Sequence, residues 1–166
     1  MLQIRRGDLD TNLVSFIDAI EELRASGFCA HLPMLLGLLA TEQANAGDIA
    51  KGMTTLDEAM NWSGSRELHW YGPELLRIKA EIILHEPSEA AHTAAEAALR
   101  QSLGWAREQG ALSWELRTAT SLARLWDGQN RRSEALALLQ PVYDRFTEGF
   151  DTADLKAAKA LLYSLQ

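Results

Sequence analysis

Apolar residues recur at intervals of three and four along this chain, and this periodicity constrains the fold more than any other feature. Leu13, Phe16 and Ile20 show the pattern near the start, and Leu155 and Leu162 show it near the end. Such spacing places side chains on one face of an α-helix. The alternation of apolar and polar residues that would indicate strands never runs for more than a few residues. The sequence therefore predicts an all-α fold.

Glycines, prolines and polar clusters mark the helix ends and predict eight helices. Gly72-Pro73 combines a cap with a first-turn proline, and Gly149 ends the seventh helix. Pro141 lies inside that helix and predicts a kink. Residues 61–69 are expected to form a polar connection, and the run from Asp151 to Asp154 resembles a capping box.

Composition excludes several classes of protein. The chain has 166 residues, 47% hydrophobic and 23% charged, which is typical of one folded domain rather than a disordered segment. Its net charge of -7 is unlike that of nucleic-acid-binding domains, which are usually basic. The apolar stretch from Leu32 to Ala40 is under half the roughly 20 residues that span a bilayer, and no signal peptide is evident. A single cysteine suits a reducing compartment. We therefore expect a cytoplasmic protein that binds neither nucleic acid nor membrane.

The helices pair up, and the pairs share one plan. A small residue early in the second helix of each pair recurs at Gly52, Ala95 and Ala135, about 40 residues apart. Small positions in the first helices fall at Ala40, Ala80 and Ala123. The predicted plan is a single domain over 1–166, with a half repeat at 8–26, repeats at 31–63, 70–109 and 112–148, and a capping helix at 151–165.

This plan resembles a tetratricopeptide-repeat (TPR) array, in which small residues lie where two helices cross closely. The resemblance implies a right-handed α-α superhelix, a TPR-like solenoid of helical hairpins. The repeat is longer than the family's usual 34 or so residues, and the signature tryptophan and closing proline are absent. A HEAT-like array, whose period is about 40–47 residues, stays open as an alternative.

Four runs of sequence, at 74–81, 94–103, 115–126 and 146–155, carry a closer resemblance. They are similar to the repeat region of large bacterial multidomain proteins. There, a class III adenylate/guanylate cyclase domain or a winged-helix DNA-binding domain precedes an ATPase module. The resemblance implies a sensor or interaction segment of a signalling protein, without the cyclase's paired metal-binding aspartates. The unpaired helix at 8–26 is expected of a piece of a longer parent; a short natural protein is the alternative.

Motifs that carry chemistry are sparse. No phosphate-binding glycine loop, dinucleotide fingerprint or His-Glu-x-x-His helix occurs, so we expect neither an enzyme nor a cofactor. The run from His85 to His92 brings two imidazoles and two carboxylates near one turn, and such groups can hold zinc. A polar turn between helices explains the same run, and we expect no metal. Cys29 reads as a small buried filler rather than a nucleophile, and Trp70-Tyr71 as an exposed pair.

The first helices of the hairpins are expected to line an inner surface with the residues that lie off their packing stripes. These residues are Met34, Gly37, Thr41 and Asn45 in the first repeat, Glu74, Arg77 and Glu81 in the second, and Arg117, Thr120 and Arg124 in the third. Arg77, Arg117 and Arg124 would then form a basic strip inside an acidic protein. Guanidinium groups bind carboxylates bidentately, so the predicted ligand is an acidic peptide or a C-terminal carboxylate. Alternatively, the arginines pair with Glu81 and Glu115 and only pin the superhelix.

The sequence thus predicts a non-enzymatic protein-interaction or regulatory module. Its predicted partner-binding residues are Asn45, Arg77, Glu81, Arg117 and Arg124, and its partner is a protein, a peptide or another domain of the parent chain. The alternative is a structural assembly element that forms a homodimer or packs on the parent's ATPase module through exposed apolar surface.

Overall fold

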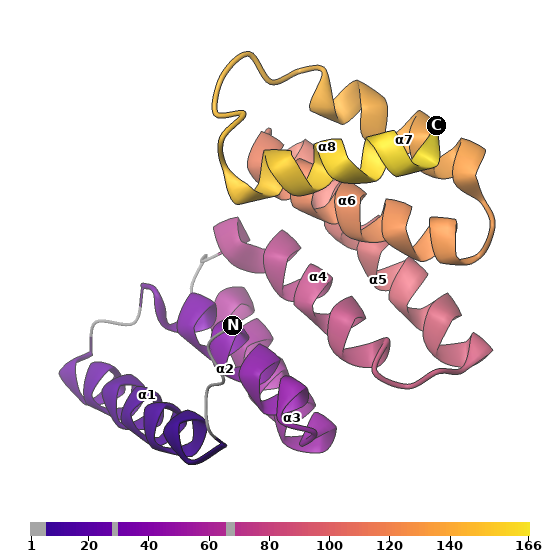
Figure 1. Cartoon of the computed structure of the whole chain (residues 1–166). Coiled ribbons are helices and arrows are strands. Elements are labelled where there is room, and N and C mark those ends of the chain that lie inside the picture. Colours follow the sequence, from indigo (N-terminus) through magenta and orange to yellow (C-terminus); the bar gives the residue numbers. More distant parts are fainter. Residues whose placement is uncertain (1–5, 28–29, 66–68) are drawn as a thin grey trace. The chain divides into compact units, whose positions relative to one another are not determined.

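The protein is all-helical in the computed structural model, which describes residues 6–27, 30–65 and 69–166 (Figure 1). Those residues contain eight α-helices and one short 3-10 turn, η1, and no strand. The helices are α1 (Arg6–Ser26), α2 (Leu32–Asn45), α3 (Ile49–Ser65), α4 (Gly72–Ile83), α5 (Glu89–Glu108), α6 (Leu112–Gly128), α7 (Arg132–Tyr143) and α8 (Ala153–Leu165), and η1 is His69–Tyr71. None of the described helices combines the length and the apolarity that a membrane span requires.

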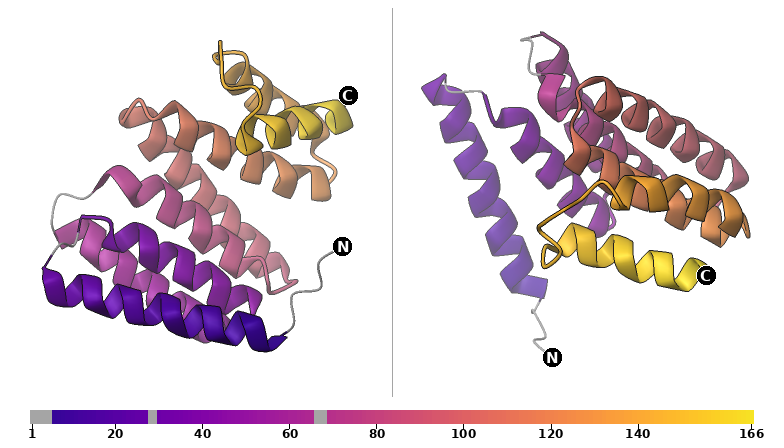
Figure 2. Two further views of the ribbon diagram at one scale, coloured as in Figure 1. Left: turned by 60° about the vertical axis from the view of Figure 1, so that its left-hand side comes forward. Right: turned by 90° about the horizontal axis from the view of Figure 1, so that it is seen from above.

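The chain divides into two compact units, Met1–Tyr71 and Gly72–Gln166. In the first unit, α2 packs mainly against α3, and α1 packs against α2. In the second unit, α4 pairs with α5 and α6 pairs with α7, while α8 contacts both α6 and α7 (Figure 2). Helices that follow one another in sequence are therefore the main packing partners within each unit.

The α2–α3 hairpin depends on a very close approach of two backbones at Gly52. A Cβ atom placed on Gly52 would lie 2.8 Å from the carbonyl oxygen of Ala40 and 3.3 Å from the Cβ of Ala44. Leu36 and Leu56 are fully buried beside this crossing. The small residues at 40 and 52 let the helices come close enough for these leucines to fill the space around them.

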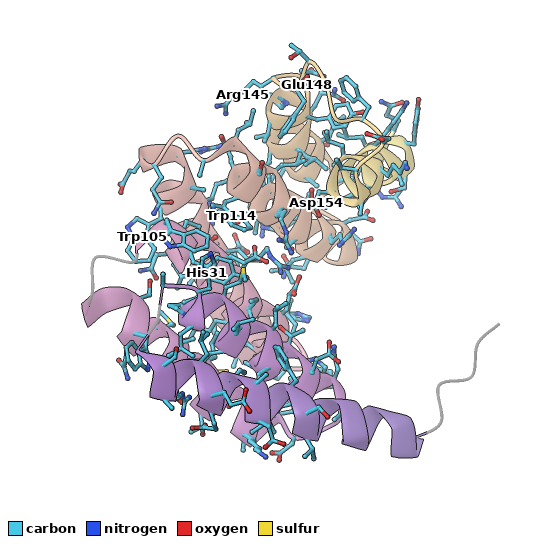
Figure 3. All side chains as sticks on the ribbon, turned by 90° about the vertical axis from the view of Figure 1, so that its left-hand side faces the viewer. His31, Trp105, Trp114, Arg145, Glu148 and Asp154 are labelled. Atoms are coloured by element: carbon cyan, nitrogen blue, oxygen red, sulfur yellow. The ribbon has the colours of Figure 1, made fainter. Side chains whose placement is uncertain are left out.

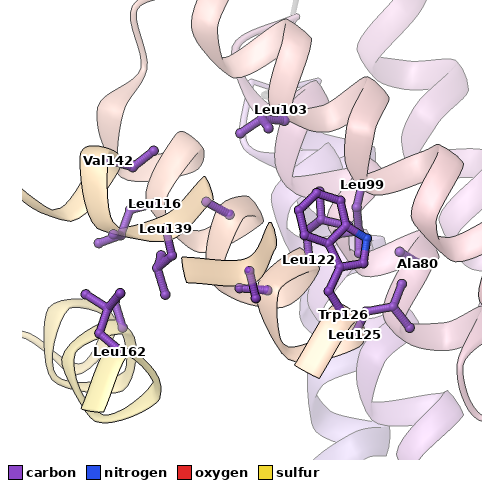
Figure 4. Packing of buried hydrophobic residues seen from close by; sticks show 14 of the residues in the cluster. Ala80, Leu99, Leu103, Leu116, Leu122, Leu125, Trp126, Leu139, Val142 and Leu162 are labelled. Carbon is purple, nitrogen blue, oxygen red and sulfur yellow. The ribbon is translucent and has the colours of Figure 1, made fainter. Parts of the chain in front are cut away.

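The second unit has one continuous apolar core. Trp126 is 6% exposed and lies with Leu99 and Leu122 between the two hairpins (Figure 4). Leu139 on α7 and Leu162 on α8 extend the same cluster. Because α8 buries one face against this core, its first turn is held beside α6.

A buried hydroxyl pair ties three helices of the second unit together. The Ser102 hydroxyl on α5 donates a hydrogen bond of 2.6 Å to the carbonyl oxygen of Pro73 on α4. The hydroxyls of Ser102 and Thr118 on α6 lie 2.8 Å apart in a second hydrogen bond, and both side chains are fully buried. A buried hydroxyl without a partner is costly, so these bonds fix how α4 and α6 lie beside each other.

The structure corrects several predicted helix ends. Residues 61–65 are the last turn of α3 rather than part of a connection, and Ser63 is buried. The seventh helix ends at Tyr143, two residues after Pro141, and not at Gly149. A proline breaks the hydrogen-bond ladder, so termination soon after it costs little.

The predicted capping box at the start of α8 is also wrong. Thr152, rather than Asp151, is the N-cap residue, and its side chain does not cap the helix. Instead the Thr152 hydroxyl donates to the carbonyl oxygen of Gly149, at 2.8 Å. Asp154 therefore lies in the first turn of α8 with its carboxylate available for other contacts. Of the predicted exposed pair, Trp70 is 43% exposed and Tyr71 is buried.

Candidate functional site

The buried carboxylate of Glu74 organises the arginines of α4 and α6. Glu74 is 2% exposed, and its two oxygens accept hydrogen bonds of 2.8 Å from Nε and Nη2 of Arg77, one turn later on α4. Nη2 of Arg117 on α6 lies 2.8 Å from the same carboxylate. Arg77 also bonds Glu81 one turn further along. Two guanidinium groups therefore neutralise one buried carboxylate at the contact between α4 and α6.

Next to this cluster is a pocket of about 180 Å³, formed by α4, α6 and α8. Its lining residues are Arg77, Arg117, Thr120, Ser121, Arg124, Asp154 and Ala157. Because a water molecule occupies about 30 Å³ in the liquid, the pocket has room for roughly six waters or for a carboxylate side chain. Figure 3 labels Asp154 at the start of α8, together with Trp114 on α6.

The three arginines of the pocket differ in how they are engaged. Arg77 is 9% exposed and bonded on both sides within α4. Arg117 pairs with Glu74, lies 5.5 Å over the Trp114 ring, and has Asp154 at 3.8 Å from its Nε. Arg124, two turns further along α6, is exposed and pairs with no other residue in the described part of the chain. Arg124 is thus the guanidinium that is open to a ligand.

Four of the five predicted partner-binding residues lie at this site. Arg77, Arg117 and Arg124 line the pocket, and Glu81 borders it through Arg77 and through a hydrogen bond of 3.3 Å from Ser121. Asn45 lies elsewhere, exposed at the end of α2 in the first unit. In that unit Gly37 is buried, and Thr41 donates to its carbonyl oxygen.

The alternative pairing scheme is correct in part. Arg77 does pair with Glu81, but Glu115 takes no part in the pocket and instead pairs with Arg107 and Arg145. Arg117 pairs with Glu74, which was predicted to line the inner surface but is buried and bonded to two arginines. Sequence reasoning also missed Asp154, because only the long-range packing of α8 on α6 brings it to the pocket.

A second pocket adjoins the first and shares Asp154 with it. It has a volume of about 310 Å³, and its lining residues are Ser113, Leu116, Phe146, Glu148, Gly149, Thr152, Asp154 and Leu155. Leu116, Phe146 and Leu155 make its floor apolar, whereas Glu148 and Asp154 make its rim acidic. The first turn of α8 therefore separates an arginine-lined pocket from one with acidic groups at its edge.

A separate charged cluster, formed by residues of α5 and of the start of α7, surrounds Trp126 of α6. Glu96 accepts hydrogen bonds from Arg100 at 2.8 Å and from Arg131 at 2.8 Å, and both guanidinium groups lie over the Trp126 ring, at 5.1 and 4.6 Å. Burial alone would raise the pKa of Glu96, but the hydrogen bonds from Arg131 and Arg100 hold it below its ordinary value of 4.5. Arg131 also binds Glu134 bidentately and lowers the pKa of that carboxyl.

This cluster predicts a loss of stability in acid. A carboxyl whose pKa is lower in the folded chain stabilises the fold above its unfolded pKa, and the gain is lost as pH falls through the folded value. We expect Glu96→Gln to remove about 1 kcal/mol of stability at pH 7 and much less well below pH 4.5. Thermal unfolding at both pH values measures the difference. Glu108→Gln, an exposed change on the same helix, is the control; equal pH dependence in the two variants would contradict this assignment.

Side chains that commonly bind metal ions do not cluster in the described part of the chain. No group of three or more His, Cys, Asp and Glu side chains suited to a metal ion occurs among the residues that the structure describes. In the run from His85 to His92, His85 is exposed in the turn between α4 and α5, and His92 is half-buried on α5. Cys29 lies outside the described residues.

A functional assignment for this chain depends on the chemistry and geometry of its own residues. No family model, no curated protein sequence and no solved structure matches this chain.

Proposed function

We propose that this chain is a TPR-like interaction module of a multidomain signalling protein, and that its second unit binds an acidic segment of a partner. The pairing of consecutive helices, α4 with α5 and α6 with α7, supports a repeat architecture. In such an array the first helices of the hairpins form the binding surface. Both first helices of the second unit, α4 and α6, contribute arginines to one pocket.

The observation that carries the proposal is the state of Arg124. An exposed arginine normally pairs with a neighbouring carboxylate or points into solvent, whereas Arg124 lines a pocket beside two other guanidinium groups. The carboxylates of Glu74 and Glu81 are already engaged by Arg77 and Arg117. A planar guanidinium presents a fork of N–H donors that matches a carboxylate, so a ligand carboxylate is the natural partner of Arg124.

Replacing Arg124 tests this role. We expect Arg124→Ala to weaken binding of an oligoglutamate peptide, acetylated and amidated at its ends, by about tenfold, because a charge-assisted hydrogen bond is lost. Chemical-shift changes in the labelled full chain, followed during a peptide titration, measure the affinity and locate the contact. The matched oligoglutamine peptide should give no shifts at the pocket.

Arg132→Ala is the control variant, because Arg132 is also exposed but lies on α7 and pairs with Asp127 at 2.9 Å. It removes the same charge from the same unit without touching the pocket. If Arg124→Ala binds the acidic peptide as tightly as the wild-type chain, or if Arg132→Ala weakens binding equally, the proposal fails.

Self-association is the second candidate, and exposed apolar side chains favour it. In the second unit Phe150 is 48% exposed and Tyr163 on α8 is 67% exposed, and apolar surface of this kind can contribute to an interface between copies of a chain. Sedimentation of the full chain over a concentration series distinguishes the two functions. A dimer that forms with rising concentration, and that Tyr163→Ser disrupts, would favour an assembly element.

A further inference from the structure

Asp154 occupies an unusual position in the arginine-lined pocket. It lies in the first turn of α8, its side chain is 52% exposed, and its Oδ2 is 3.8 Å from Nε of Arg117. At this distance the two charges attract, but an N–H···O hydrogen bond needs about 2.7–3.2 Å. The Nε edge of Arg117 therefore faces a carboxylate without a hydrogen bond to it.

The other carboxylates at the pocket are held far more firmly. Glu74 is almost fully buried and has three contacts of 2.8 Å to guanidinium nitrogens. Glu81 is bonded to Arg77 and accepts from Ser121. Asp154 is more exposed than either and has a single, long ion pair within the described residues. Of the three carboxylates, Asp154 therefore needs the least free energy to be displaced from its arginine by solvent or by a ligand.

We propose that Asp154 is an internal competitor for the ligand of this pocket, an inference that rests on the proposed function. In the unliganded chain its carboxylate stands at the Nε edge of Arg117. The incoming carboxylate takes that place, accepts hydrogen bonds from Arg117, and has the open guanidinium of Arg124 beside it. Asp154 then turns toward solvent, which its exposed position at the start of α8 allows.

The first test removes the competing charge. We expect Asp154→Asn to bind the oligoglutamate probe about three- to tenfold more tightly than the wild-type full chain, because an exposed ion pair and a nearby like charge are worth that much. Asparagine keeps the shape of the side chain and removes only its charge. Asp154→Ser is the second variant; it shortens the side chain as well and is expected to give a similar gain.

Asp151→Asn is the matched control. Asp151 is exposed three residues earlier, just before the start of α8, and does not line the pocket. Its substitution removes the same charge and should change the affinity less than twofold. If Asp151→Asn gains as much as Asp154→Asn, the effect is general electrostatics and the internal competitor is disproved.

A double-mutant cycle with Arg117 shows whether Asp154 acts through that residue. Arg117→Lys keeps a positive charge near Glu74 but loses the forked donors, so the gain from Asp154→Asn should fall below twofold in this background. If Arg124→Ala weakens binding while neither Asp154 variant strengthens it, the competitor is wrong and the proposed function stands. If neither the wild-type chain nor the Asp154 variants bind the probe, both are wrong.

Discussion

Replacing Glu74 with alanine is expected to lower the free energy of unfolding by about 3 kcal/mol. Glu74 is 2% exposed and is the shared acceptor for Arg77 on its own helix and Arg117 on α6. Removing it takes the bidentate carboxylate away from Arg77, which is also buried, and leaves the more exposed Glu81 on its other side. A buried charge that loses its partner costs far more than the pair contributes when intact.

Urea denaturation followed by circular dichroism and tryptophan fluorescence measures this loss. Glu81→Ala provides the comparison, because Glu81 bonds the same arginine from the same helix but its side chain is 41% exposed. That change should cost less than about 1 kcal/mol, as exposed ion pairs do. Equal losses in the two variants would show that Glu74 does not organise the cluster.

Gly52→Ala is expected to destabilise the first unit by about 2 kcal/mol, although alanine is the better helix former. The intrinsic preference for alanine over glycine is worth about 1 kcal/mol in a helix interior. Against it, the new Cβ would lie 2.8 Å from the carbonyl oxygen of Ala40, a backbone atom that no rotamer change can move. Separating α2 from α3 to relieve this contact disrupts the packing around it. Overpacking costs about 1–3 kcal/mol, and because this clash is with the backbone we take the upper value, which leaves about 2 kcal/mol after the gain in helix propensity.

Gly104 on α5 provides the control, because a glycine-to-alanine change there should have the opposite effect on the free energy of unfolding. It is exposed, and a Cβ there would meet no atom within 4 Å. Gly104→Ala should therefore raise the free energy of unfolding by up to about 1 kcal/mol through helix propensity alone. Thermal and urea unfolding of both variants test the pair, and a stabilising effect of Gly52→Ala would refute the close crossing of α2 and α3.

Local signals in the sequence predicted the helices and much of their pairing. Gly72-Pro73 does begin α4. Ser88, a residue type common at N-caps, caps α5 by accepting a hydrogen bond of 3.1 Å from the backbone N–H of Ala91. The small residue at Gly52 does lie at a helix crossing. Such features depend on neighbours in sequence, so periodicity and capping residues reveal them.

The errors arose where tertiary packing decides the outcome. Ser63 is polar and suggests a turn, but it is buried in the last turn of α3, where packing overrides its low helix propensity. Glu74 looked like a surface residue because acidic side chains are rarely buried without partners. Its partner Arg117 lies on another helix, and no spacing within α4 reveals that contact. Asp154 reaches the pocket for the same reason, through the packing of α8.

The hydroxyl pair at Ser102 and Thr118 also limits how the second unit can change shape. If α5 slipped by one turn along its neighbours, two hydroxyls and the Pro73 carbonyl would lose their partners in a water-free interior. Each such loss costs about 1–3 kcal/mol, so sliding of these three helices is strongly opposed. If binding of a ligand to the pocket changes the shape of the second unit, we therefore expect the change in α8 and its connecting segment rather than in the relative positions of α4, α5 and α6.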